Sequence, residues 1–121
     1  MSNPIRIAAV FGATGVALGA FGAHGLKSIL AANESLEVWR TASSYHLLHA
    51  VVLLWLAGRH PQYRKSFVFL TLGILTFSGS LYVLALTNVR ILGAITPLGG
   101  LMLILGWSAL LFSGAKASKS P

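Results

Sequence analysis

Residues 7–23 read IAAVFGATGVALGAFGA, an apolar run without a single charged side chain. A helix rises about 1.5 Å per residue, so about 20 apolar residues cross a hydrocarbon core of roughly 30 Å. Three further uncharged, mostly apolar runs follow, at residues 41–57, 67–86 and 91–113. The sequence therefore predicts an all-α, polytopic membrane protein.

The composition agrees with this class. Only 9% of the residues are charged and 55% are hydrophobic, against a charged share of about 25% in soluble domains. We expect a single domain over residues 1–121, an up-down bundle of four transmembrane helices. Its spans should cover approximately residues 5–24, 36–57, 65–86 and 91–113, with a short interfacial helix at residues 26–32 (LKSILAA) between the first two.

The net charge of +7 follows the pattern of a membrane protein and does not indicate nucleic-acid binding. Lys and Arg are concentrated in cytoplasmic loops. With the N-terminus inside, the inner side carries six of them, Arg6, Arg59, Arg64, Lys65, Lys116 and Lys119. The outer side then carries three, Lys27, Arg40 and Arg90. This count predicts that both termini are cytoplasmic.

Small residues recur in the first run at spacings of 4, 3, 4 and 3, at Ala8, Gly12, Gly15, Gly19 and Gly22. On a helix this spacing forms one stripe, and small residues let membrane helices approach closely. We expect the first span to be the central packing element, with the four glycines as its contact surface.

Several residues predict where helices begin and end. Asn33 is a plausible N-cap of the second span, and Glu37 and Arg40 are three residues apart and can pair on one helix face. Gly58 is a plausible stop for the same span. Pro97, followed by Gly99 and Gly100, predicts a kink or a break early in the fourth span.

The polar residues of the spans separate into two layers by depth. His24, Glu37, Arg40 and Arg90 lie at headgroup level at the outer end. Deeper in the outer half lie Tyr45, His46, His49, Ser78, Ser80, Tyr82 and Thr96. Polar side chains within a membrane face the bundle interior or a wet cavity, so these residues, with His24 and Arg90, are the candidate lining of a pocket.

The histidines leave alternatives open. His24 is either an interfacial residue that holds the turn after the first span or part of the polar layer. His46 and His49 are three residues apart and share a face. They either hydrogen-bond Ser78, Ser80 or Tyr82 across helices, or handle a ligand, lipid or proton, or bind a metal.

Four segments carry a resemblance to a known family: GAFGAHGLK (19–27), TASSYHLLHA (41–50), FSGSLY (77–82) and ITPLGG (95–100) with Trp107. With them the chain resembles the YgdD/YwdK-like inner-membrane proteins, a family catalogued as a domain of unknown function. The resemblance covers essentially the whole chain. It implies four transmembrane helices in a bacterial plasma membrane, and it implies no activity.

The residues argue against an enzyme, since the only carboxylates, Glu34 and Glu37, lie in the outer connection and no metal or cofactor motif is present. A small transporter is disfavoured because proton-coupled exporters need a carboxylate within the membrane. Two hypotheses remain. The first is a pocket for a small molecule or lipid in the outer half. The second is an assembly module that packs against itself or another membrane protein through the glycine face.

Overall fold

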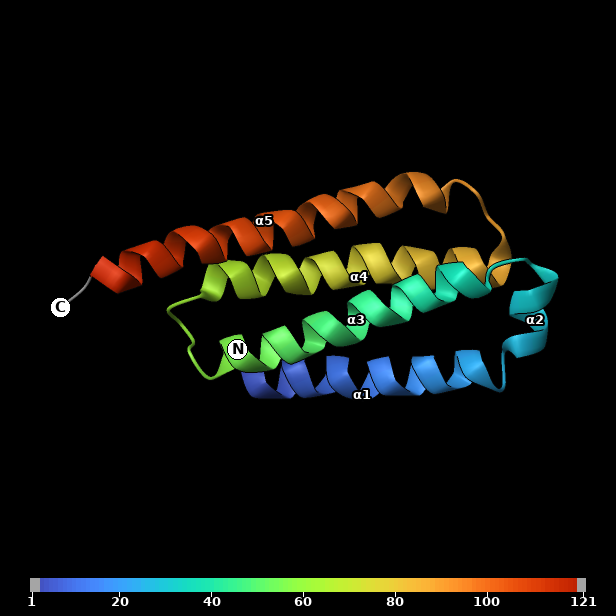
Figure 1. Ribbon diagram of the computed structural model, residues 1–121, viewed down its shortest axis with the longest axis horizontal. Helices are drawn as coiled ribbons and strands as arrows, with labels where there is room; N and C mark the ends of the chain where they lie inside the picture. Colours follow the sequence, from blue (N-terminus) through green and yellow to red (C-terminus); the bar gives the residue numbers. More distant parts are fainter. Residues whose placement is uncertain (1–2, 120–121) are drawn as a thin grey trace.

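The structure, a computed structural model, describes the backbone of residues 3–119 and the surroundings of side chains as far as residue 114. These residues form five helices: α1 (Pro4–Ala23), α2 (Lys27–Ala32), α3 (Leu36–Ala57), α4 (Arg64–Thr87) and α5 (Leu92–Lys119) (Figure 1). The prediction of an all-helical chain is confirmed, and α2 is the short helix between the first two long ones.

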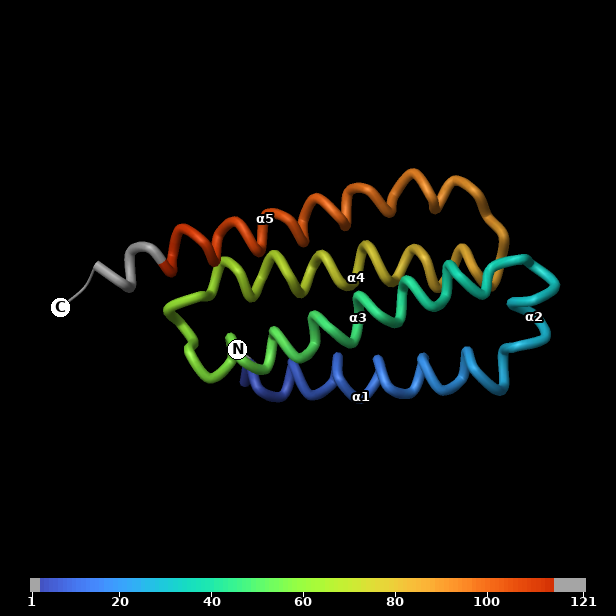
Figure 2. Tube along the Cα trace, in the orientation of Figure 1, coloured from blue at the N-terminus to red at the C-terminus, as the bar shows by residue number. Residues whose placement is uncertain are grey.

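The four long helices lie side by side in chain order and alternate in direction, as the Cα trace shows (Figure 2). α1 packs on α3, α3 on α4 and α4 on α5. Within the described residues, the backbone of α1 packs against neither α4 nor α5. The up-down bundle is thus an open row with α1 and α5 at its edges.

The position of α1 corrects the expectation that the first span is central. The most extensive contact is between α4 and α5, and its seam is formed by glycines of these two helices. A Cβ atom on Gly106 would lie 2.6 Å from Leu70 Cδ2, and one on Gly73 would lie 2.6 Å from Leu103 Cδ2. A Cβ on Gly99 would collide with the backbone of Phe77. These distances leave no room for a larger side chain.

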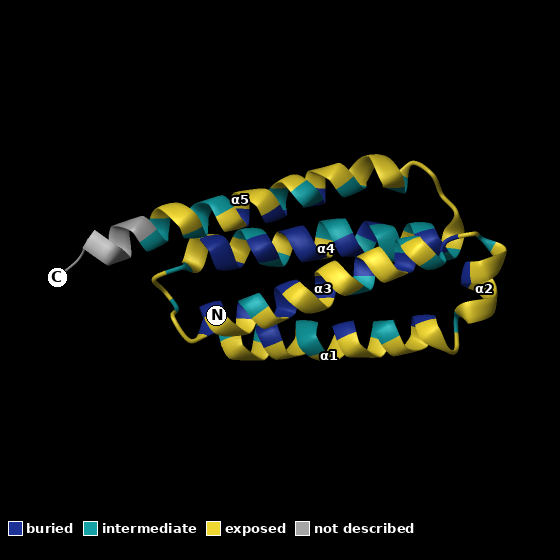
Figure 3. Cartoon of the chain, viewed as in Figure 1, coloured by how far each residue is buried: buried dark blue, intermediate teal, exposed yellow. Residues whose placement is uncertain are grey.

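The pattern of side-chain burial reflects the arrangement of the four long helices in a row (Figure 3). The main core cluster joins all four long helices, through residues such as Ala8, Leu53, Leu70 and Leu103, whereas the outward faces of α1 and α5 are largely exposed. Those faces are apolar, with Val16 61% and Leu111 70% exposed. α1, α4 and residues 92–114 of α5 are long and apolar enough to cross a membrane.

The connections show which local predictions hold. Gly58 is the C-cap of α3, as expected, and Arg40 Nη1 pairs with Glu37 Oε1 at 2.9 Å. Asn33 is not the N-cap of α3. It ends α2, and its side-chain amide donates instead to the carbonyls of Ala85 and Leu86 at the end of α4. α5 runs through Pro97 as one helix, so the alternative of a break is wrong. Pro97 is the sixth residue of α5, beyond the four N–H groups that the start of a helix leaves free, so it removes one hydrogen bond within the helix.

Candidate functional site

His46 lies on α3 at the centre of a polar cluster that joins three helices. Its Nδ1 is 2.8 Å from Tyr82 Oη on α4, and its Nε2 is 3.2 Å from Thr14 Oγ1 on α1. Thr14 Oγ1 itself donates to the carbonyl of Val10 at 2.8 Å. Since that hydroxyl proton is committed, Nε2–H donates to Thr14, and in the neutral imidazole Nδ1 then accepts from Tyr82. Both ring nitrogens of His46 thus have a partner.

His49 forms a separate link between α3 and α5. Its Nδ1 lies 2.8 Å from the carbonyl oxygen of Tyr45, which can only accept, so Nδ1 carries the hydrogen. Its Nε2 accepts from Trp107 Nε1 at 3.1 Å. His49 is thus the opposite neutral tautomer from His46. The two histidines bond different neighbours, so the expected common face does not bring them into one site.

Hydroxyl groups make further links between neighbouring helices. Ser78 Oγ donates to the carbonyl of Ala42 at 2.8 Å and joins α4 to α3. Ser80 Oγ lies 2.6 Å from Thr96 Oγ1 and joins α4 to α5. The buried polar residues expected in the outer half therefore bond across helices. They do not line one common pocket: His46, Ser78 and Tyr82 border one groove, and Tyr45 and His49 border another.

Three other expected site residues lie at the margin of this arrangement. Tyr45 is exposed and its ring stacks on His49, with ring centroids 6.0 Å apart. His24 caps the end of α1 and Arg90 lies in the connection from α4 to α5, and both are exposed. The structure brings neither of these two into the polar links of His46 or His49.

The glycine stripe of α1 divides into two pairs. Gly15 and Gly22 are buried against α3, where a Cβ on Gly15 would lie 3.2 Å from Leu47 Cδ1 and one on Gly22 would collide with the Trp39 indole. Gly12 and Gly19 have no side-chain or neighbouring-helix atom within 4 Å of such a Cβ. Only two of the four glycines of the predicted packing surface contact another helix within the described part of the chain.

Sequence reasoning missed three residues of these links: Thr14, Trp39 and Trp107. Trp39 Nε1 donates to the carbonyl of Leu18 at 2.9 Å, and its ring meets the Tyr82 ring edge-on with centroids 4.7 Å apart. The sequence did contain signals for these residues. Thr14 is a polar residue in an apolar run, and a buried tryptophan requires an acceptor for its indole N–H.

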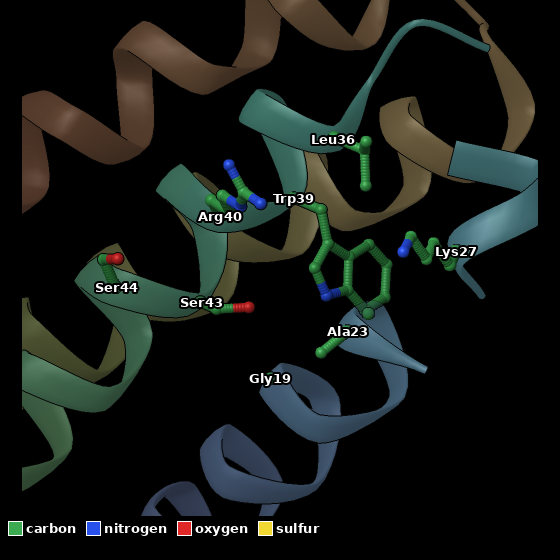
Figure 4. A pocket seen from close by; sticks show the side chains of 9 residues that line it. Gly19, Ala23, Lys27, Leu36, Trp39, Arg40, Ser43 and Ser44 are labelled. Carbon is green, nitrogen blue, oxygen red and sulfur yellow. The ribbon is translucent and has the colours of Figure 1, made fainter. Parts of the chain in front are cut away.

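A cavity of about 440 Å³ lies where α1 ends, α2 begins and α3 begins (Figure 4). Its lining comprises Gly19, Gly22, Ala23, Lys27, Leu36, Trp39, Arg40, Ser43 and Ser44. Figure 4 shows Trp39 between α3 and α1, with Lys27 extending toward it from α2. Ser43 Oγ is buried in this wall and has no hydrogen-bond partner among the described residues. Apart from two glycines, none of the expected site residues lines this cavity.

Two further grooves, both smaller and more apolar than this cavity, lie beside the histidines. One of about 180 Å³ runs between α1 and α4 beside His46 and Tyr82. The other, of about 400 Å³, lies between α3 and α5 beside His49 and Trp107. In the described part of the chain, no three His, Asp or Glu side chains are grouped to hold a metal ion.

Long apolar helices, exposed apolar faces and buried polar links between helices together define a helical integral membrane protein. The chain belongs to the family described as "Protein of unknown function (DUF423)", whose model matches residues 18–100.

Relatives of the same kind cover most of the chain. It is 39% identical over 118 residues to the UPF0382 membrane protein YwdK of Bacillus subtilis, covering 93% of this chain and 95% of that protein. It is 38% identical over 117 residues to the UPF0382 inner membrane protein YgdD of Escherichia coli, covering 93% and 88%. It is also 45% identical over 105 residues to a UPF0382 membrane protein of Staphylococcus saprophyticus, covering 84% and 87%. No solved structure matches the chain.

Proposed function

We propose that the protein crosses the bacterial plasma membrane four times, with α3 as the fourth span beside α1, α4 and α5. α3 has 22 residues, or about 33 Å of helix, and packs between α1 and α4. It is less apolar than its neighbours because it carries His46 and His49. Both are buried and bonded to adjacent helices, so their cost within a membrane is reduced.

The charges support an orientation with both termini in the cytoplasm. Arg6, Arg59, Arg64 and Lys65 lie at the end of the row that holds the N-terminus, while Lys27, Arg40 and Arg90 lie at the opposite end. The side chains of Lys116 and Lys119 are outside the described part. Lys and Arg are retained on the cytoplasmic side, so the cavity faces outward.

Single cysteines test both statements, because the chain has no cysteine of its own. Ser28→Cys on α2 should react in intact cells with a maleimide that does not cross membranes. Gln62→Cys, between α3 and α4, should react only after the cells are permeabilised. Reaction of both from outside would mean that α3 does not span, and the reverse pattern would invert the orientation.

The function that the geometry supports best is binding, without catalysis, of a small molecule or membrane lipid in the cavity between α1, α2 and α3. The observation that carries it is the cavity itself, which has the volume of a ligand site. In the proposed orientation this cavity lies at the outer surface of the bilayer. The ring nitrogens of both histidines are taken up by hydrogen bonds within the bundle, and neither histidine lines this cavity.

The polar links serve this function by holding the cavity wall. Trp39 forms part of the wall, and it is fixed by its bond to Leu18 and by its contact with Tyr82. Tyr82 is fixed in turn by His46. A ligand that meets a wall held in this way loses less free energy to ordering of the protein.

The test is a native mass spectrum of the protein released in a mild detergent, with two matched glycine variants. Wild type should carry mass beyond its own chains. Gly19→Leu should lose it, because Gly19 lines the cavity and its Cβ direction is open, so a leucine fits and fills the space. Gly12→Leu, equally open but away from the cavity, should retain it. Bare wild-type chains, or a ligand kept by Gly19→Leu, would refute the proposal.

The open space at Gly12 and Gly19 favours a second candidate, assembly through the glycine face of α1. A helix of another copy or another membrane protein would pack on these two residues. In that case Gly12→Leu and Gly19→Leu would both lower the oligomeric mass in the same spectra. The ligand proposal predicts that Gly12→Leu changes neither ligand nor oligomer.

A further inference from the structure

The charged residues that line the outer cavity have one sign. They are Lys27 from α2 and Arg40 from α3, and no carboxylate lines the cavity. The whole chain has only two acidic residues. One of them, Glu37, pairs with Arg40, but the two side chains are 85% and 71% exposed, and such exposed pairs are weak. An anion that enters the cavity can therefore compete for Arg40.

The donors in the cavity suit an oxygen-rich ligand. Arg40 has five N–H donors and Lys27 has three, and the Glu37 pairing uses Nη1 alone. Trp39 offers its ring and not its N–H, because Nε1 donates to Leu18. Ser44 is exposed beside Arg40 and adds a hydroxyl group. Two cationic side chains beside an apolar ring match a charged oxygen group attached to an apolar body.

We infer that the ligand of this cavity is an anion that carries a phosphate group, held by Lys27 and Arg40. This inference rests on the proposed binding function and names the chemistry of its ligand. Guanidinium groups recognise phosphate in a two-pronged geometry, and lysine does so as a point charge. In the proposed four-span arrangement the site lies at the level of the lipid headgroups, so the phosphate belongs either to an anionic lipid or to a soluble phosphate compound.

The experiment is a lipid titration by native mass spectrometry in a neutral detergent, with phosphatidylglycerol and phosphatidylcholine as probes. Wild type should bind phosphatidylglycerol at least about tenfold more tightly than phosphatidylcholine, from two cations near the membrane surface. Lys27→Gln/Arg40→Gln should lose this preference. Arg64→Gln/Lys65→Gln removes the same charge from exposed residues at the opposite end, and it should retain the preference.

The remaining measurements distinguish a lipid headgroup from a soluble phosphate as the ligand. They also distinguish failure of the anion inference from failure of the proposed binding function. Competition by inorganic phosphate at millimolar concentration would assign the site to soluble phosphates, and its absence would assign it to the lipid headgroup. Equal binding of both lipids by wild type, or an unchanged preference in Lys27→Gln/Arg40→Gln, would overturn the anion inference. If wild type bound both lipids equally and Gly19→Leu abolished this binding, the anion inference would be wrong but the proposed binding function would stand. Arg40→Lys, which keeps the positive charge, should retain most of the preference for phosphatidylglycerol, as expected if the loss in Lys27→Gln/Arg40→Gln is due to charge.

Discussion

Tyr82 Oη lies 2.8 Å from His46 Nδ1, and this bond joins the two helices in the middle of the row. On one side, His46 continues to Thr14 on α1. On the other, the Tyr82 ring meets Trp39, whose indole bonds Leu18 on the same α1 helix. α1, an edge helix, is thus held at two heights by one connected set of side chains. The cavity between α1, α2 and α3 lies directly beside the contact made by Trp39.

Removal of the Tyr82 hydroxyl tests the strength of this connection. In Tyr82→Phe the ring remains against Trp39, but His46 Nδ1 loses its donor in a buried position. We expect the free energy of unfolding to fall by about 1–2 kcal/mol, measured by titration from mild detergent into denaturing detergent. Tyr63→Phe is the control, because the Tyr63 hydroxyl only accepts an exposed bond from Gln62. Its effect should stay within about 0.5 kcal/mol, and equal losses in both variants would contradict the assignment.

The bond from Trp107 to His49 predicts a measurable coupling between α5 and α3. A double-mutant cycle with Trp107→Phe and His49→Leu should give a coupling of about 0.6–1.7 kcal/mol, the range for such bonds within membranes. The same cycle with Trp55→Phe is the control. Trp55 is six residues from His49 on the same helix, or about 9 Å away, and its ring packs with Tyr63 and Arg59 instead. Those two changes should be additive within about 0.5 kcal/mol.

The backbone at Glu34 predicts a stabilising change. Glu34 has φ 53°, in the left-handed region, where an L side chain costs about 1–2 kcal/mol and glycine does not. Glu34→Gly should raise the free energy of unfolding by about 0.5–1 kcal/mol, after allowance for the greater freedom of glycine in the unfolded chain. Ser28→Gly, at an exposed helical position in α2, should instead lower it slightly. A loss in Glu34→Gly would show that its side chain makes a contact that matters more than the backbone.

Helical spacing predicted much of the fold because each helix is determined by local sequence. α3 begins at Leu36 and ends at Ala57, and Gly58 stops it where the pattern changes. His46, His49, Ser78 and Thr96 were expected to face the bundle interior or a cavity as the lining of a pocket. All four bond to a neighbouring helix, which for the histidines is one of the alternatives that the sequence left open.

The partners themselves did not follow, because they depend on which helices are neighbours. Periodicity does not show which helices are neighbours, so it did not predict that α1 lies at an edge of the row or that Gly12 and Gly19 face no other described helix. The cavity was missed for a similar reason. Its residues come from the corner formed by α1, α2 and α3, and the direction of Lys27 depends on how α2 folds back there. Asn33 likewise serves α4, which is more than 50 residues away in sequence.

The sharpest stability prediction compares a glycine in the α4–α5 seam with one outside it. Replacing each by alanine should change the free energy of unfolding in opposite directions. In Gly99→Ala the new Cβ meets the Phe77 backbone, which cannot move without separating the helices. The free energy of unfolding should fall by about 1–3 kcal/mol, as in other overpacked sites. Gly79→Ala, within α4 and with no other atom within 4 Å of its Cβ position, should raise it by about 0.5–1 kcal/mol through helix propensity. Both values come from the same detergent titration. If both variants were stabilised, α4 and α5 would have to lie further apart than the glycines allow, and the row would not be held at this seam.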